Sequence, residues 1–128
     1  MNNIFLYDGI VVLNDWGCAV KIDSPVPFSG SLTLAPNDVV TAILKEKDMD
    51  AKYIPKPSHD LEMIVKCLYV RLNPVFRLCH LEQTVDGVKA RSEFWKKELK
   101  GDLWKQMLSA ASKCNYEDLG NIIRSILA

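Results

Sequence analysis

One acidic residue stands where it could bind a metal ion. Asp15 follows the apolar run Val11–Leu13 and is followed directly by Trp16 and Gly17. Such a run favours a β-strand, and glycine lets the chain turn sharply behind it. A carboxylate held at the end of a rigid strand is a suitable ligand for a hard cation such as Mg²⁺. The same carboxylate would also serve simply to cap the turn, and the tripeptide alone leaves both interpretations open.

The cysteines and histidines favour structural roles. The four cysteines are far apart and include no Cys-x-x-Cys pair: Cys18, Cys67, Cys79 and Cys114. His59 precedes Asp60 and His80 follows a cysteine, but adjacent side chains point in different directions and no nucleophile lies in a suitable turn. We therefore expect reduced, buried thiols, and histidines that lie at the surface or are satisfied by hydrogen bonds.

Length and composition narrow the class of protein. The chain has 128 residues, of which 48% are hydrophobic and 25% charged, with 16 basic and 16 acidic side chains. A single domain over residues 1–128 is expected. The balanced charge disfavours nucleic-acid binding. No apolar run approaches the ~20 residues that cross a bilayer, and no signal sequence is evident. We expect an intracellular protein, cytoplasmic or nuclear, with no membrane partner.

The elements that would position Asp15 form a short β segment. Two apolar stretches, Ile4–Tyr7 and Ile10–Leu13, flank Asp8-Gly9, which is a dipeptide favoured in two-residue hairpin turns. The pattern predicts a hairpin, followed by a short third strand over residues 18–22. Prolines and glycine then predict a long irregular loop from residue 23 to residue 36.

The rest of the chain has helical patterns. A helix is expected to open at Pro36-Asn37-Asp38, and a very apolar one is expected from Ser58, its N-cap, to Asn73. Three more helices are predicted at about residues 86–100, 102–113 and from the N-cap Asn115 onwards. The fold class is therefore mainly α with a small N-terminal β hairpin (α+β), and the apolar helix at about 58–73 is expected to be central, surrounded by the C-terminal helices.

The motifs in this order resemble the second half of the protein-kinase C-terminal lobe. Asn3, followed by an apolar residue, is similar to the asparagine that closes the kinase catalytic loop. Asp15-Trp16-Gly17 is similar to the Asp-Phe-Gly motif, with tryptophan in place of phenylalanine. By this resemblance, Asn3 and Asp15 would be a vestigial metal-binding pair.

Two further segments extend the resemblance. Gly30, followed by Ala35-Pro36-Asn37, is similar to the end of a kinase activation segment, with asparagine replacing the family glutamate. Asp60 is similar to the buried aspartate that starts the central helix and braces the catalytic loop. Leu-Asn-Asp-Trp-Gly-Cys-Ala also resembles kinase-like proteins of fungi and oomycetes, including Crinkler-type effectors, which implies delivery into host cells and a nuclear location.

The resemblance implies a module without the full catalytic machinery. Phosphoryl transfer needs a catalytic base and a phosphate-binding lysine that this chain does not supply. We therefore expect a non-catalytic, pseudokinase-like C-lobe module, an effector or regulator, that acts through protein contacts or self-association and needs no cofactor. The alternative is a segment of a larger Ser/Thr kinase-like phosphotransferase, which would bind Mg²⁺ and ATP only when completed by upstream sequence.

Self-association is expected from the central helix. Without upstream helices to cover it, this helix would leave an apolar patch that soluble monomers seldom tolerate. The interface candidates are Leu61, Ile64, Val65 and Leu68. A homo-oligomer, such as a dimer with or without exchanged elements, or a complex with another protein would cover them.

Overall fold

The computed structural model describes residues 4–13, 16–73 and 81–127. Within these ranges the fold is mainly helical with a small N-terminal hairpin, which confirms the predicted class. The elements follow in the order β1 (Ile4–Tyr7), β2 (Ile10–Leu13), a 3-10 turn (Trp16–Cys18), β3 (Val26–Pro27), α1 (Asn37–Glu46), β4 (Lys52–Tyr53), α2 (Pro57–Leu72), α3 (Val85–Glu98), α4 (Asp102–Ser112) and α5 (Tyr116–Leu127).

The N-terminal hairpin forms as predicted, with Asp8 and Gly9 in its turn. β1 and β2 are antiparallel, with Ile4 opposite Leu13 and Tyr7 opposite Ile10. The two turn residues both have positive φ, 48° at Asp8 and 75° at Gly9, as a type I′ turn requires. The predicted third strand over residues 18–22 is wrong, because the chain forms a 3-10 turn at Trp16–Cys18 and then continues without a strand partner.

The loop before α1 is tied to the connector before α2. β3 pairs antiparallel with β4 through Val26 opposite Tyr53. The backbone N–H of Asp23 also donates to the carbonyl oxygen of Pro55 at 3.1 Å. Proline is compatible with so short a strand because Pro27 lies at its end. These contacts hold the otherwise irregular segment over the N-terminal end of α2.

The N-caps of α2 and α5 can be compared with the predicted ones. The N-cap Lys56 donates its backbone N–H to Nδ1 of His59 at 3.1 Å, so Ser58 is not the cap of α2. Pro57 takes the first helical position, where proline is favoured, and this moves the start ahead of the serine. The predicted cap of α5 is confirmed, since Oδ1 of Asn115 accepts from the backbone N–H of Asp118 at 3.1 Å.

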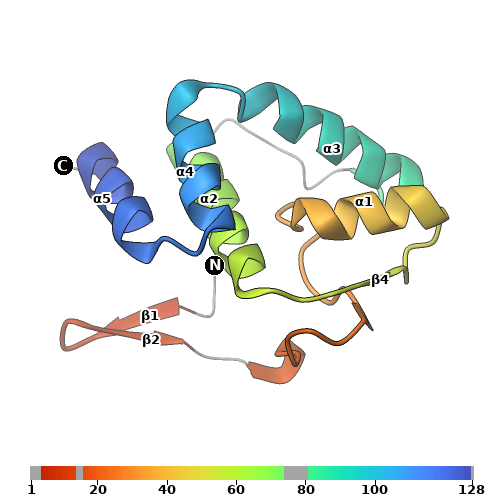
Figure 1. Ribbon diagram of the computed structural model, residues 1–128, viewed down its shortest axis with the longest axis horizontal. Helices are drawn as coiled ribbons and strands as arrows, with labels where there is room; N and C mark the ends of the chain where they lie inside the picture. The colour runs from red at the N-terminus through yellow and green to blue at the C-terminus, as the bar shows by residue number, and fades with distance from the viewer. Residues whose placement is uncertain (1–3, 14–15, 74–80, 128) are drawn as a thin grey trace.

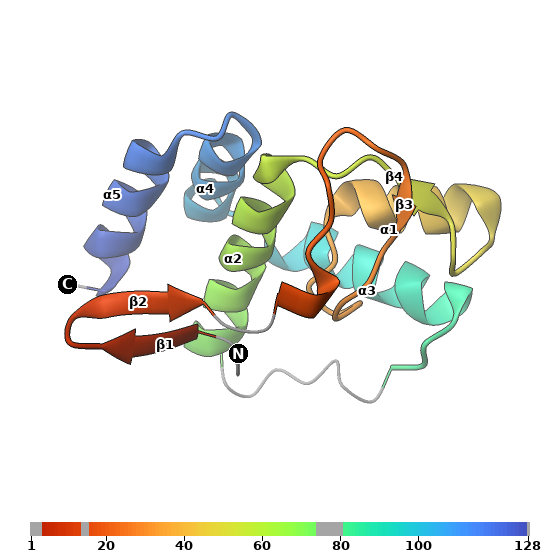
Figure 2. The ribbon, with the colours of Figure 1, turned by 90° about the horizontal axis from the view of Figure 1, so that it is seen from below.

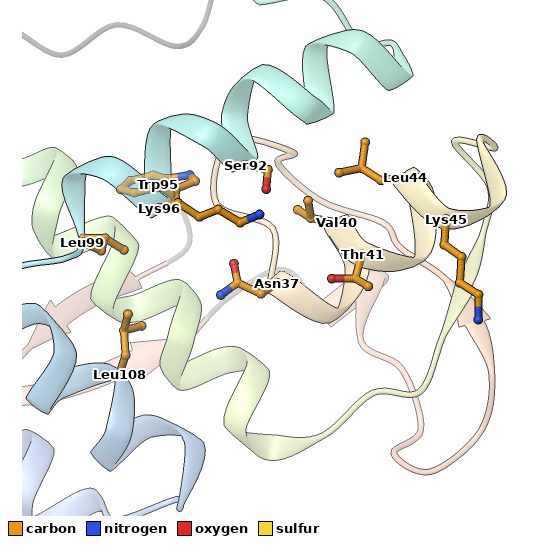
Figure 3. A pocket seen from close by; sticks show the side chains of 10 residues that line it. All are labelled: Asn37, Val40, Thr41, Leu44, Lys45, Ser92, Trp95, Lys96, Leu99 and Leu108. Carbon is orange, nitrogen blue, oxygen red and sulfur yellow. The ribbon is translucent and has the colours of Figure 1, made fainter.

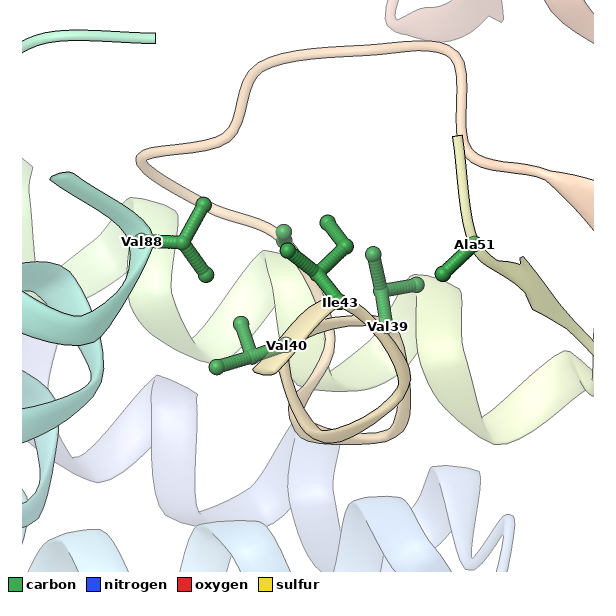
Figure 4. Packing of buried hydrophobic residues seen from close by; sticks show 6 residues of the cluster. Val39, Val40, Ile43, Ala51 and Val88 are labelled. Carbon is green, nitrogen blue, oxygen red and sulfur yellow. The ribbon is translucent and has the colours of Figure 1, made fainter. Parts of the chain in front are cut away.

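The core consists of three clusters of buried side chains. The first joins α1 to α3 and β4 (Figure 4): Ala35, Val39, Val40, Ile43, Ala51 and Val88. The second joins α2, α4 and α5: Leu61, Val65, Met107, Ala110, Ala111 and Leu119. The third joins α2 to α3 near α4: Tyr69, Trp95 and Leu99.

The helix α2 is central, as predicted. It contributes to two of the clusters and packs along α4, while α5 and the α1–α3 pair lie at opposite ends of the molecule (Figure 1). The hairpin lies below the helices in Figure 1, and in Figure 2, which is seen from below, it lies in front of the C-terminal end of α2. Among the described helices, none has the length and apolarity to cross a bilayer.

Candidate functional site

The first part of the chain presents an unusually apolar surface. Every described residue from 6 to 22 is exposed. The large apolar side chains in this stretch keep 42 to 74% of their surface accessible: Leu6, Tyr7, Ile10, Val11, Val12, Leu13, Trp16, Val20 and Ile22. We call this set the N-terminal apolar surface. Contiguous apolar patches on monomers usually mark an interaction site.

The hairpin is apolar on both faces. Cross-strand partners share a face, so Leu6, Val11 and Leu13 lie on one face, while Tyr7 and Ile10 lie on the other with Val12. In the described part of the chain, neither strand packs against a helix or a further strand. A two-stranded sheet is marginal in water unless a face is covered or a strand is added. The hairpin therefore lacks the cover that its residue types call for.

The edges of the hairpin also lack protection. Natural sheets commonly block an exposed edge with lysine, proline or a bulge. Neither Ile4–Tyr7 nor Ile10–Leu13 contains a charged residue or a proline, and the two strands pair without a bulge. The sole charge between the first and last strand residue is Asp8, in the turn. The hairpin is thus open to contact with another chain.

The chain at the start of α1 is held to α2 by the buried side chain of Lys66. Lys66 is 1% exposed, and its ammonium group contacts the carbonyl oxygen of Ala35 at 2.6 Å, Oδ1 of Asn37 at 3.2 Å and Oε1 of Glu62 at 3.1 Å. These oxygens match the three donors of an ammonium group. The same Glu62 oxygen accepts from the backbone N–H of Asn37 at 2.8 Å. The start of α1 is therefore fixed to α2 by charge-assisted hydrogen bonds.

Helix α3 completes this anchor. The indole N–H of Trp95 donates to the carbonyl oxygen of Thr33 at 2.8 Å, and Nζ of Lys66 lies 5.8 Å from the centroid of the Trp95 ring. Burial lowers the pKa of Lys66, and the nearby Glu62 carboxylate opposes this change. The buried charge is thus stabilised by one carboxylate and one aromatic face.

Two of the pockets in the structure are lined by residues of the predicted motifs. One, of about 550 Å³, lies between α1 and α3, with Leu108 of α4 at one end (Figure 3). Lys45 and Lys96 are its charged lining residues, and it has no acidic residue or histidine. The other, of about 390 Å³, is lined by Trp16, Pro36 and Asp60 among others. Three residues singled out in separate sequence motifs thus come together at one pocket.

The remaining predicted site residues have separate fates. Asn3 and Asp15, the predicted vestigial metal pair, lie outside the described residues. Gly17 lies in the 3-10 turn, and an added Cβ at Gly30 would lie 3.0 Å from the ring of Phe28. Asp60 lies in the first turn of α2, where a helix start was predicted, but its side chain is exposed rather than buried as the resemblance implied. An acidic residue at this position favours the helix through the macrodipole.

The predicted interface on α2 needs correction. Leu61 and Val65 are buried, because α4 and α5 cover this face, and Leu68 packs partly buried in the same cluster. Only Ile64 of the four candidates is exposed, at 45%. The open apolar surface lies on the hairpin instead. The sequence indicates this surface, because consecutive positions are apolar in both strands. A sheet of only two strands has few ways to bury both of its faces.

The described residues contain no group of three or more histidines, cysteines and carboxylates that could hold a metal ion. Cys18, Cys67 and Cys114 are free thiols, but none of the three is buried as predicted, because Cys18 is exposed and the other two are partly exposed; Cys79 lies outside the described residues. His59 is buried and hydrogen-bonded on both ring nitrogens, with Asp38 at 2.9 Å, so its interpretation as a satisfied histidine is confirmed.

Comparison of the chain with protein-family models, with curated proteins and with solved structures found no match. The resemblance to the kinase C-terminal lobe therefore stays a prediction from the motifs.

Proposed function

We propose that this chain is a non-catalytic protein-binding module whose N-terminal apolar surface makes the contact. The observation that carries the proposal is the hairpin, which exposes apolar side chains on both faces and packs on no other described element. Burying such surface against a partner is favourable by about 25 cal/mol per Å². A partner would also supply the cover or the additional strand that stabilises a two-stranded sheet.

A kinase-like ancestry is part of the proposal, and two features support it. The order of hairpin, turn, irregular loop and apolar central helix agrees with the order that the motifs imply. Trp16, Pro36 and Asp60 line one pocket. Asn37 departs from the family glutamate, and in this chain it is held by Lys66 and Glu62. An effector or regulator of this kind would act by binding to a partner rather than by catalysis.

The alternative is a segment of a Ser/Thr kinase-like phosphotransferase. The pocket at Trp16 and Asp60 favours it, because this is where the motif residues meet. Calorimetric titration of this chain with Mg²⁺ and ATP tests the alternative in one direction, because a phosphotransferase that binds them only when completed by upstream sequence would also give no heat. The binding module predicts no heat of binding above the dilution blank. A saturable heat that requires Mg²⁺ and disappears in Trp16→Ala would favour the phosphotransferase.

The protein-binding function is tested with a matched pair of variants. Leu6→Lys combined with Val11→Glu replaces two apolar side chains that lie opposite each other, and the opposite charges keep the cross-strand pair favourable. Ile64→Lys makes a similar change at an exposed apolar position on α2. Partners are captured by affinity purification from cells that express each form, after circular dichroism has confirmed the helical content. A partner held by wild type and Ile64→Lys but lost from the hairpin variant supports the function, and equal capture by all three contradicts it.

A further inference from the structure

We propose that the partner of the N-terminal apolar surface is a second copy of this chain. The face formed by Leu6, Val11 and Leu13 packs against the same face of the other copy across a two-fold axis. This inference rests on the proposed function and names the partner that the surface takes.

The chemistry of the hairpin selects such a partner. Leu6, Val11 and Leu13 are 74, 65 and 51% exposed, and all three are purely aliphatic. The opposite face includes Tyr7, whose hydroxyl group tolerates contact with water. An aliphatic face without charge provides no group to orient a polar or ionic ligand, so its complement must also be apolar and uncharged. An identical face satisfies this condition by symmetry, as in isologous dimers.

The extent of the surface agrees with that of a dimer interface. With roughly 100 Å² exposed on each of the three large apolar side chains of the aliphatic face and of the three that follow the hairpin, one copy offers about 600 Å², or about 1,200 Å² for both copies together. This total reaches the lower end of the range of about 1,200–2,000 Å² that stable interfaces bury. The aliphatic face would form the centre of the contact. Trp16, Val20 and Ile22, which follow the hairpin and are 66, 43 and 49% exposed, would extend it.

The rest of the described surface offers no comparable site for a second copy. The other exposed large apolar residues are distributed over the connector before α2 and over α2, α4 and α5: Ile54, Ile64, Leu72, Leu103, Tyr116 and Leu127. Single exposed apolar residues of this kind are normal on soluble proteins. The apolar face of α2 that could have competed is already covered within the chain by α4 and α5.

The test measures the mass of the full chain in solution by sedimentation velocity over a range of concentrations. Wild type is expected to reach twice the monomer mass of 14.5 kDa as concentration rises. The combination of Leu6→Lys and Val11→Glu is expected to remain monomeric. Ile64→Lys, at an exposed apolar position outside this surface, is expected to dimerise like wild type. A monomeric wild type at every concentration, or a hairpin variant that still dimerises, would overturn the inference.

Cysteine cross-linking tests the contact without adding charge. In a Cys18→Ser background, which removes an exposed thiol, Val11→Cys is expected to give a disulfide-linked dimer under mild oxidation, and Ile64→Cys is not. Equal cross-linking at both positions would contradict a two-fold contact at the hairpin. If the wild type is monomeric but captures another protein that the Leu6→Lys and Val11→Glu variant does not capture, the dimer is refuted and the protein-binding function stands. If the Leu6→Lys and Val11→Glu variant matches wild type in both its mass in solution and its captured partners, both the dimer and the protein-binding function are refuted.

Discussion

The Nζ atom of Lys66 lies 2.6 Å from the carbonyl oxygen of Ala35, which is 31 residues earlier in the chain. The lysine is 1% exposed and belongs to the central helix, whereas the alanine ends the long irregular segment before α1. An unpaired ammonium group at this depth would be very costly. The contact therefore fixes where the irregular segment joins the helical core.

Lys66→Met is expected to lower the free energy of unfolding by about 2–4 kcal/mol, because it leaves the Ala35 carbonyl and the largely buried Glu62 carboxylate without their cation. Urea denaturation followed by circular dichroism measures the change. Lys45→Met, at an exposed position on α1, is the control and should stay within about 0.5 kcal/mol of wild type. Equal effects of the two substitutions would contradict the role of Lys66 as an anchor.

Two helical glycines should respond to alanine in opposite directions. A Cβ at Gly87 of α3 would lie 1.9 Å from the backbone oxygen of Glu82, so Gly87→Ala is expected to destabilise by about 2–3 kcal/mol. At Gly120 of α5 the nearest atom would be 3.8 Å away, so Gly120→Ala should stabilise by about 0.5–1 kcal/mol. Thermal and urea unfolding give both values. A stabilising Gly87→Ala would disprove the close approach of residue 82 to α3.

Alkaline pH should weaken a contact between α2 and α3. The hydroxyl group of Tyr69 donates to Oε2 of Glu98, and burial, followed by this hydrogen bond and the carboxylate charge, raises the pKa of Tyr69 to about 12 from 10.0. Between these values the unfolded chain has lost the proton that the folded chain retains, so stability falls as pH rises. The advantage of wild type over Tyr69→Phe should shrink by on the order of 2 kcal/mol across this window.

Urea denaturation of both proteins at a series of pH values measures that advantage. Because the other titrating groups are common to both chains, the difference isolates Tyr69. An advantage that stays constant from pH 10 to pH 12 would show that the Tyr69 proton is not retained by the folded state.

Asp60→Asn is expected to change the stability by less than about 1 kcal/mol, because an exposed carboxylate at a helix start acts mainly through the macrodipole. Burial, and then the charge of Asp60, raise the pKa of Tyr53, so the substitution should lower that pKa in a spectrophotometric titration. A loss of several kcal/mol would instead indicate that Asp60 braces other parts of the chain from a buried position.

The sequence predicted the features that depend on neighbouring residues. The Asp8-Gly9 turn needs two residues that tolerate positive φ, and the cap of α5 needs Asn115 three positions before Asp118. Both are local, so the pattern was sufficient. Ser58 was misassigned because proline and serine at adjacent positions are both compatible with a helix start, and the contact from Lys56 to His59 decides between them.

The features that the sequence did not predict depend on distant residues. Lys66 is a charged residue within an apolar helix, and its spacing of four from Glu62 was a local signal, but its partners Ala35 and Asn37 are 31 and 29 residues away. Likewise, the burial of Leu61 and Val65 follows from the position of α4 and α5, more than 35 residues further along the chain. Apolar periodicity shows which face is buried but not what covers it.

The division of the core into separate clusters affects how the protein opens locally. Val39, Ile43 and Val88 hold α1 to α3, whereas Val65 and Met107 belong to the cluster of α2, α4 and α5. Amide hydrogens in cooperative units exchange together, at rates set by the opening of each unit. The amides at the two ends of the molecule should therefore exchange as two groups, with the hairpin amides fastest. The polar contacts of Lys66 lie between these groups, and there one group can open while the other stays folded.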